Sequence, residues 1–355
     1  MATQKFKQLP YGNSDFGSIR TGNYAYVDKT QYIEMLEDES NKSQFFIRPR
    51  KFGKSLFFSM LSYYYDINQA DKFEELFGDL YIGKHPTPEK NKYAMLEFDF
   101  SGIETSSEER FMVSFSEKIR KAVRYFFRAY SNLFSEADLF VKQIDAEKQG
   151  IDVLEKVFYA AKLDKVKLFV IIDEYDQFAN DLIAMGSGAG KKFYKNMIKA
   201  NGLVRDFYEN LKIATKSSIV NRTFITGISP VMLDDLTSGY NIATILTLDR
   251  SYNEMMGFTQ EEVNDLMKIT GVDPKLITIN MEQYYNGYLF HEDGEHKVYN
   301  PSMILYFFSR ILKREPLKNI IDPNQRTDYG RIENLIKNKK NRDILINIIK
   351  EGGIA

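Results

Sequence analysis

The chain has 355 residues, of which 43% are hydrophobic and 27% are charged, and its formal net charge is −1. This length suits one large or two linked globular domains, the composition argues against extended disorder, and the balanced charge provides no general field for nucleic acid. The absence of cysteine excludes disulfides and thiolate metal sites, and the lack of an apolar signal region or a membrane-length apolar run predicts a cytoplasmic protein.

Short apolar runs alternate with helical patterns over roughly the first 256 residues. Runs rich in apolar and β-branched residues predict strands over 44–48, 95–100, 167–172 and 222–228. Helical periodicity occurs between and around these runs, over 29–36, 54–65, 106–149, 152–163 and 191–216. The alternation predicts an α/β fold in which a doubly wound parallel sheet is flanked by helices.

The pattern changes after residue 256, where short helices and turns replace the alternation. Thr259 is a favourable N-cap, and Glu262 three positions later completes a capping box at the start of TQEEVNDLMKI. We therefore expect two domains, an α/β core over 1–256 and a smaller, mostly helical domain of a lid or winged-helix-like kind over 257–355.

A phosphate-loop motif, RPRKFGKS, lies between the first predicted strand and the helix that follows it. Gly53, Lys54 and Ser55 match the pattern G-x-x-x-x-G-K-[ST], whereas Arg48 stands where the first glycine belongs. Main-chain N–H groups would surround the phosphates, Lys54 would reach the β- and γ-phosphates, and Ser55 would ligate Mg²⁺. A basic surface turn is the alternative. The residues of this segment predicted to bind a nucleotide are Arg48, Arg50, Lys51, Phe52, Gly53, Lys54, Ser55 and Leu56.

A second glycine-rich segment, GSGAGKK over 186–192, resembles a phosphate loop only superficially. No apolar strand leads directly into it, and Lys192 offers no hydroxyl for Mg²⁺. We expect this segment to be a flexible loop.

Acidic residues follow the most apolar strand, LFVII, as Asp173 and Glu174. Because ligands bind at the carboxyl ends of parallel strands, Asp173 is expected to hold the hydration shell of Mg²⁺ and Glu174 to polarise the attacking water. Solvated acids at a strand end are the alternative. Thr226, near the end of the next predicted strand, is a candidate sensor of the γ-phosphate or only a strand-end residue. Asp176 is either an outer acid of the site or a surface charge.

Several segments resemble, in order, the bacterial AAA-ATPase-like domain family. They are LPYGNSDFGSIRTGNYAYVDKT, RPRKFGKSL, LFVIIDEYD, RTFITGISP, GFTQEEV, YYNGYLF and VYNPSMIL. The family's phosphate loop also lacks the first glycine. The resemblance spans about residues 8–310 and implies an ATPase that binds ATP and Mg²⁺ through Lys54, Ser55, Asp173 and Glu174.

The resemblance carries two further expectations. Asp28 and Lys29 match a segment before the phosphate loop, which by analogy with such folds would meet the adenine. Family members often continue into a C-terminal PD-(D/E)XK nuclease-like domain, whose catalytic pattern is not seen here, so the chain is expected to stop before that domain or to lack it.

These features favour Mg²⁺-dependent ATP binding and hydrolysis that drive a conformational change, with the second domain as a lid. Because Arg48 replaces the first glycine of the loop, an alternative function is a nucleotide-dependent binding or regulatory module with little turnover. A homo-oligomer or a protein partner also stays open, and neither Arg222 nor Arg250 can be identified as an arginine finger.

A nucleic-acid-binding module that serves a nuclease is a third hypothesis. It rests on two basic clusters, although the near-zero net charge favours solvated helix faces instead. The clusters are Lys191, Lys192, Lys195 and Lys199, and Lys337, Lys339, Lys340 and Arg342.

Overall fold

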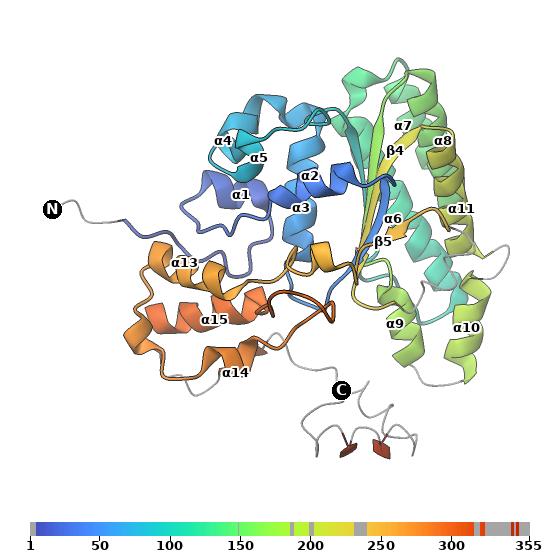
Figure 1. Ribbon diagram of the computed structural model, residues 1–355. Coiled ribbons are helices and arrows are strands. Elements are labelled where there is room, and N and C mark those ends of the chain that lie inside the picture. The colour runs from blue at the N-terminus through green and yellow to red at the C-terminus, as the bar shows by residue number, and fades with distance from the viewer. Residues whose placement is uncertain are drawn as a thin grey trace.

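The computed structural model describes residues 5–147, 149–184, 188–198, 202–230, 240–315 and 320–323, together with 342–343 and 346–347. Its centre is a five-stranded parallel sheet in the order β2-β3-β4-β1-β5, which confirms the predicted α/β class (Figure 1). The strands are β1 (Ser43–Ile47), β2 (Ala94–Asp99), β3 (Leu168–Asp173), β4 (Val220–Gly227) and β5 (Thr244–Ile245).

Helices cover both faces of this sheet. Figure 1 shows α6, α7, α8 and α11 on one side of the sheet and α1 to α5 on the other. The α-helices are α1 (Phe16–Thr21), α2 (Gln31–Asp38), α3 (Lys54–Tyr65), α4 (Phe73–Phe77), α5 (Tyr81–Lys84), α6 (Glu108–Ala129), α7 (Ala137–Ala146), α8 (Gly150–Leu163), α9 (Gln177–Ala184), α10 (Gly188–Ile198), α11 (Leu203–Lys216), α13 (Gln260–Thr270), α14 (Met281–Tyr285) and α15 (Pro301–Leu312). Short 3₁₀ helices are η1 (Ile67–Lys72), η2 (Ser131–Leu133), η3 (Arg250–Tyr252) and η4 (Pro274–Leu276).

The inner strands are apolar because both of their faces are covered. Every residue of β1, SQFFI, and of β3, LFVIID, is buried. The parallel register places Phe46 beside Thr226 and Asp99 beside Asp173. The carboxyl ends of β1, β2, β3 and β4 therefore lie along one edge of the sheet, where the phosphate loop and the strand-end acids are found.

Two of the predicted helical regions are interrupted. The region 106–149 contains α6 and α7 with η2 between them, and 191–216 contains most of α10 and all of α11. The flexible loop expected over 186–192 is wrong from Gly188 onward, because α10 begins there; residues 186–187 lie outside the described residues. Phe193 and Met197 are buried on α10, and their packing outweighs the low helix propensity of the glycines.

A second hydrophobic cluster lies apart from the one that surrounds the sheet. It joins α13, α14 and α15 through side chains that are almost fully buried, among them Val263, Leu266, Tyr285, Ile304 and Phe308. The capping box predicted at Thr259 and Glu262 is present at the start of α13. Ala25 also belongs to this cluster, and the Lys7 N–H donates to the Ile269 carbonyl at 3.0 Å. The amino-terminal segment thus packs against the elements that follow residue 257.

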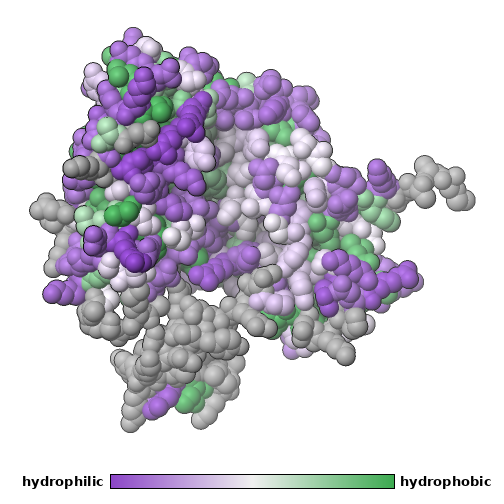
Figure 2. Space-filling view, turned by 180° about the vertical axis from the view of Figure 1, so that it is seen from behind, coloured by the Kyte–Doolittle hydropathy of each residue, from purple (hydrophilic) through white to green (hydrophobic). Residues whose placement is uncertain are grey.

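The surface seen from behind is mainly hydrophilic, with hydrophobic residues scattered over it (Figure 2). Within the described part of the chain, no helix combines the length and apolar character needed to cross a membrane.

Candidate functional site

The phosphate loop joins β1 to α3 through two residues in the left-handed region. Lys51 has φ of 67° and Gly53 has φ of 89°, and α3 begins directly afterwards at Lys54. The Lys54 ammonium donates to the main-chain carbonyls of Arg48 at 3.0 Å and Pro49 at 3.1 Å, which holds it inside the loop. Burial lowers the pKa of Lys54, while Glu174 and Asp173 act in the opposite direction. A buried cation beside the amino terminus of a helix suits phosphate oxygens.

The hydroxyl and carboxylate expected at the metal lie in direct contact. Ser55 Oγ donates to Asp173 Oδ2 at 3.1 Å, which joins the start of α3 to the end of β3. Asp173 Oδ1 accepts from the Glu174 N–H at 2.8 Å. Burial raises the pKa of Asp173, and neighbouring Asp99 raises it further. Among the described residues no group of three or more His, Asp or Glu side chains could hold a metal. A hydroxyl and one carboxylate fit Mg²⁺, which keeps waters and phosphate oxygens as its other ligands.

Glu174 combines an unusual backbone with an unpartnered carboxylate oxygen. Its φ is 52°, a conformation that costs free energy for a residue other than glycine and is frequent at functional sites. Its Oε2 is buried without a hydrogen-bond partner among the described residues. Burial raises the pKa of Glu174, whereas Lys54 lowers it. This carboxylate can accept a proton from a water molecule that enters beside it.

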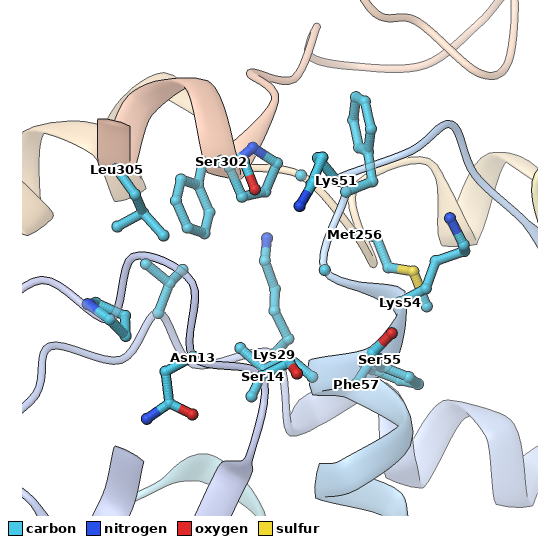
Figure 3. A pocket seen from close by; sticks show the side chains of 18 of the residues that line it. Asn13, Ser14, Lys29, Lys51, Lys54, Ser55, Phe57, Met256, Ser302 and Leu305 are labelled. Atoms are coloured by element: carbon cyan, nitrogen blue, oxygen red, sulfur yellow. The ribbon is translucent and has the colours of Figure 1, made fainter. Parts of the chain in front are cut away.

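Lys54, Ser55 and Glu174 line one side of a cavity of about 560 Å³, whereas Asp173 is not among the lining residues and contacts the lining residue Ser55. Figure 3 shows Ser55 on α3 at one side and Ser302 and Leu305 on α15 at the other. The lining also includes residues from 10–14, 25–27 and 255–258, to which the sequence analysis gave no part in the site. Of the predicted residues, the cavity wall contains Arg50, Lys51, Phe52, Gly53, Lys54, Ser55, Leu56 and Glu174.

Comparison with known proteins shows the family to which the chain belongs. The family model described as a predicted AAA-ATPase matches residues 10–237, well over half of the chain. The chain belongs to the AAA-ATPase-like family. It is 26% identical over 311 residues to a protein of Azotobacter chroococcum mcd 1 described as "Uncharacterized protein in vnfD 5'region". This match covers 86% of the chain and 52% of the relative, so the chain spans about half the length of the curated relative that it matches.

Among solved structures, the AAA-ATPase-like chain is similar to a Walker-type ATPase of Pyrococcus abyssi. The TM-score is 0.48 and the sequence identity is 11%, with 92% of this chain and 75% of that chain covered.

Arg48 points away from the cavity of this AAA-ATPase-like chain, which corrects its expected place beside the phosphates. Its side chain is fully buried between the rings of Phe46, 4.0 Å from the guanidinium carbon, and Phe290, 3.8 Å from it. Its guanidinium donates to the carbonyls of Ile47 at 3.0 Å, Thr247 at 2.8 Å and Tyr252 at 2.8 Å. Arg48 does not have the positive φ that would require glycine, so the altered motif leaves the backbone unstrained at this position.

Asp28 and Thr226, which were also predicted at the site, are not among the residues that line the cavity. Asp28 accepts from the Thr30 N–H and hydroxyl and from the Tyr81 N–H, at 2.7–2.8 Å, so it organises the start of α2 and α5. The buried Thr226 hydroxyl donates to the Phe46 carbonyl at 2.7 Å, where it fastens β4 to β1 beneath the phosphate loop. The sequence neighbour Lys29, rather than Asp28, faces the cavity.

Asp176 is neither a surface charge nor a cavity residue. It is fully buried, and it accepts from the N–H groups of Ile228 at 3.0 Å and Ser229 at 2.6 Å, which fixes the turn after β4. Arg222 lies near the amino end of β4, away from the site, with its guanidinium on the Leu36 carbonyl at 3.3 Å. Arg250 is exposed in η3.

The two basic clusters are only partly described. Lys192 and Lys195 are exposed on α10, and Arg342 is exposed in the short described stretch near the carboxyl end. The Lys191 side chain lies outside the described residues, as do all of Lys199, Lys337, Lys339 and Lys340.

Proposed function

We propose that the chain binds ATP with Mg²⁺ in the cavity and hydrolyses it. The observation that carries this proposal is the contact between Ser55 and Asp173, with the unpartnered Glu174 carboxylate oxygen beside it. The three side chains come from α3 and from the end of β3, so the sheet edge itself sets their spacing. Membership of a predicted ATPase family supports the same conclusion.

Each group has a defined part in the proposed reaction. The loop N–H groups and Lys54 bind the β- and γ-phosphates, and Ser55 and Asp173 hold Mg²⁺, which neutralises charge that develops on the phosphate oxygens. Glu174 accepts a proton from the attacking water. The new bond joins the water oxygen to the γ-phosphorus, the bond from this phosphorus to the β,γ-bridging oxygen breaks, and ADP and phosphate leave.

The apolar part of the cavity suits a nucleobase. Ala25, Val27, Met256, Phe258 and Leu266 contribute to its lining. Ligand sites are usually apolar with a few placed polar groups, and a nucleotide anchored by its phosphates at the loop would extend its base into this part.

The phosphate loop also contacts the elements after residue 257. Phe52 packs edge-on against Tyr288, with ring centroids 4.7 Å apart, and against Phe290 at 5.5 Å. The Asn300 side-chain amide donates to the Arg50 carbonyl at 3.3 Å. We propose that these contacts transmit changes of the loop to a second domain, which acts as a lid formed by the cluster around α13 and α15.

Replacement of Lys54 by alanine tests nucleotide binding. With ATP at about 100 times its Kd and with Mg²⁺, the wild-type melting temperature should rise by about 4 °C, and Lys54→Ala should abolish this rise. Lys92→Ala is the matched control, because Lys92 is exposed near the amino end of β2, at the opposite edge of the sheet. Equal stabilisation of both variants by ATP would refute the binding role.

Hydrogen exchange tests the proposed second domain. Amides of α13 and α15 should exchange through an opening of lower free energy than amides of β3 and β4, because their cluster is smaller. MgATP should slow exchange in α13 and α15 if they close over the nucleotide. A single opening free energy for both regions, with or without nucleotide, would count against separate domains.

A further inference from the structure

Lys29 is the charged residue of the cavity that the phosphate chemistry does not use. It lies in the segment before α2, its exposed fraction is 8%, and its side chain extends into the middle of the cavity (Figure 3). Among the described residues that line the cavity, the other charged side chains belong to the phosphate loop or to the end of β3. They are Arg50, Lys51, Lys54 and Glu174.

Two acceptors hold the Lys29 ammonium beside one wall of the cavity. Its Nζ donates to the Glu254 carbonyl at 2.9 Å and pairs with Glu262 Oε1 at 2.5 Å. Glu262 is itself held, because its Oε2 accepts from the Thr259 N–H at 2.8 Å in the capping box of α13. The two acceptors stand on either side of 255–258, the segment that forms part of the wall.

The hydrogen-bonding capacity of lysine indicates what the ammonium can recognise. It has three N–H donors and no acceptor, and Glu254 and Glu262 occupy two of the donors. Among the described residues the ammonium has no third acceptor, so one N–H remains for an acceptor of a ligand. Ala25, Val27, Met256 and Phe258, which surround this side of the cavity, offer apolar contact instead.

We infer that Lys29 recognises the purine base of the bound nucleotide by donating to a ring acceptor, with Glu262 as the residue that positions the ammonium. This inference rests on the proposed function, since the phosphates must sit at the loop for the base to reach Lys29. Purines carry ring nitrogens with free lone pairs, and burial strengthens a charge-assisted hydrogen bond to one of them.

The test compares ATP with inorganic tripolyphosphate, which lacks the base and the ribose, and with ribose 5-triphosphate, which lacks the base alone. The Kd of each ligand is measured with Mg²⁺ by calorimetry for wild type, Lys29→Met and the double variant Lys29→Met/Glu262→Gln. We expect Lys29→Met to weaken ATP by at least about tenfold and to change tripolyphosphate and ribose 5-triphosphate by less than about twofold each, because only ATP carries the base that accepts the hydrogen bond of the charged group.

The double variant separates recognition of the base from simple pairing with Glu262. It removes both charges, so it also avoids an unpaired carboxylate if Lys29→Met alone fails to fold. ATP binding should remain weak in the double variant. Recovery of wild-type ATP affinity would show that Lys29 only neutralises Glu262, and equal weakening of ATP and tripolyphosphate would show that it serves the phosphates or the fold. Weakening of ribose 5-triphosphate as well as ATP, with tripolyphosphate unaffected, would show that it binds the ribose and would overturn the inference.

Failure of the proposed function would look different. If wild type bound tripolyphosphate no better than Lys54→Ala does, the phosphate site itself would be wrong, and the inference would fail with it. Tripolyphosphate binding that depends on Lys54, together with ATP binding unaffected by Lys29→Met, would overturn the inference about Lys29 alone.

Discussion

Replacement of Glu174 by glutamine should lower the rate of ATP hydrolysis by about two to four orders of magnitude while leaving ATP affinity nearly unchanged. The amide has almost the same shape as the carboxylate, but it cannot accept the proton of the attacking water. Glu174 Oε2 has no hydrogen-bond partner among the described residues, and the hydroxyl of Ser55 donates to Asp173 instead. The ground state should therefore bind as before. Single-turnover hydrolysis and an independent measurement of the ATP Kd check the two parts.

The same substitution should stabilise the nucleotide-free protein at neutral pH. Burial raises the pKa of Glu174 above its unfolded value, so the folded state binds this proton more tightly than the unfolded state does. At pH 7 the ionised carboxylate therefore costs stability, and this cost disappears as the pH falls through the raised pKa. Glu174→Gln removes it at all pH values, and its melting temperature should exceed that of wild type at pH 7 more than at pH 4.

Asp173→Asn should affect ATP binding, in contrast to Glu174→Gln, which should affect hydrolysis. Asp173 accepts from Ser55 and would hold the metal in the ground state, so this variant should weaken Mg²⁺-dependent ATP binding before any effect on chemistry. If Glu174→Gln hydrolysed ATP at the wild-type rate while Lys54→Ala did not, Glu174 would not be the base. Hydrolysis near zero in wild type, with intact ATP binding, would instead favour the regulatory module with little turnover.

The sheet and the polar centre of the site could be predicted because local patterns determine them. LFVII is a continuous apolar run because β3 is buried on both faces, and residues after such a strand must lie at the ligand-binding edge. Gly53, Lys54 and Ser55 form a contiguous motif at a strand-to-helix junction. Their spacing in the structure follows from the main chain alone, so no knowledge of tertiary contacts was needed.

The rest of the cavity could not be predicted, because it depends on contacts between distant segments. Lys29 faces the cavity and Asp28 does not, and this choice is made by Tyr81, whose N–H binds Asp28, and by Glu262, which binds Lys29. In the segment 255–258, only Gly257 and Phe258 belong to a family-like stretch, GFTQEEV, and that stretch indicated no ligand contact. A faint signal was present in the capping box at Thr259 and Glu262, which fixes a partly buried carboxylate at the start of α13.

Replacement of Arg48 by glycine, which would restore the usual phosphate-loop pattern, should instead destabilise the fold. The Arg48 side chain fills the space between Phe46 and Phe290, and its guanidinium satisfies three main-chain carbonyls. Glycine would leave a cavity and carbonyl oxygens without these donors, and it would add backbone freedom to the unfolded chain. We expect the free energy of unfolding to fall by about 3 kcal/mol or more. Chemical denaturation followed by circular dichroism measures this loss.

Two further variants divide the effect between packing and hydrogen bonding. Arg48→Met keeps most of the apolar volume and loses the donors, whereas Arg48→Lys keeps the charge and loses the planar fork that reaches Ile47, Thr247 and Tyr252 together. Both should be destabilised, and each by less than Arg48→Gly. The exposed Arg50, two positions away, provides the control, and Arg50→Gly should change the free energy of unfolding by less than about 1 kcal/mol.

The opposite result would indicate that Arg48 contacts the bound nucleotide. If Arg48→Gly unfolded at the same denaturant concentration as wild type but bound tripolyphosphate more weakly, its charge would act on the phosphates. Because the side chain is buried behind the loop, we expect Arg48→Gly to lower the free energy of unfolding more than it weakens tripolyphosphate binding. Because Phe290 also packs on Phe52 of the phosphate loop, the loss should appear in hydrogen exchange as earlier opening of 288–298 than of β3.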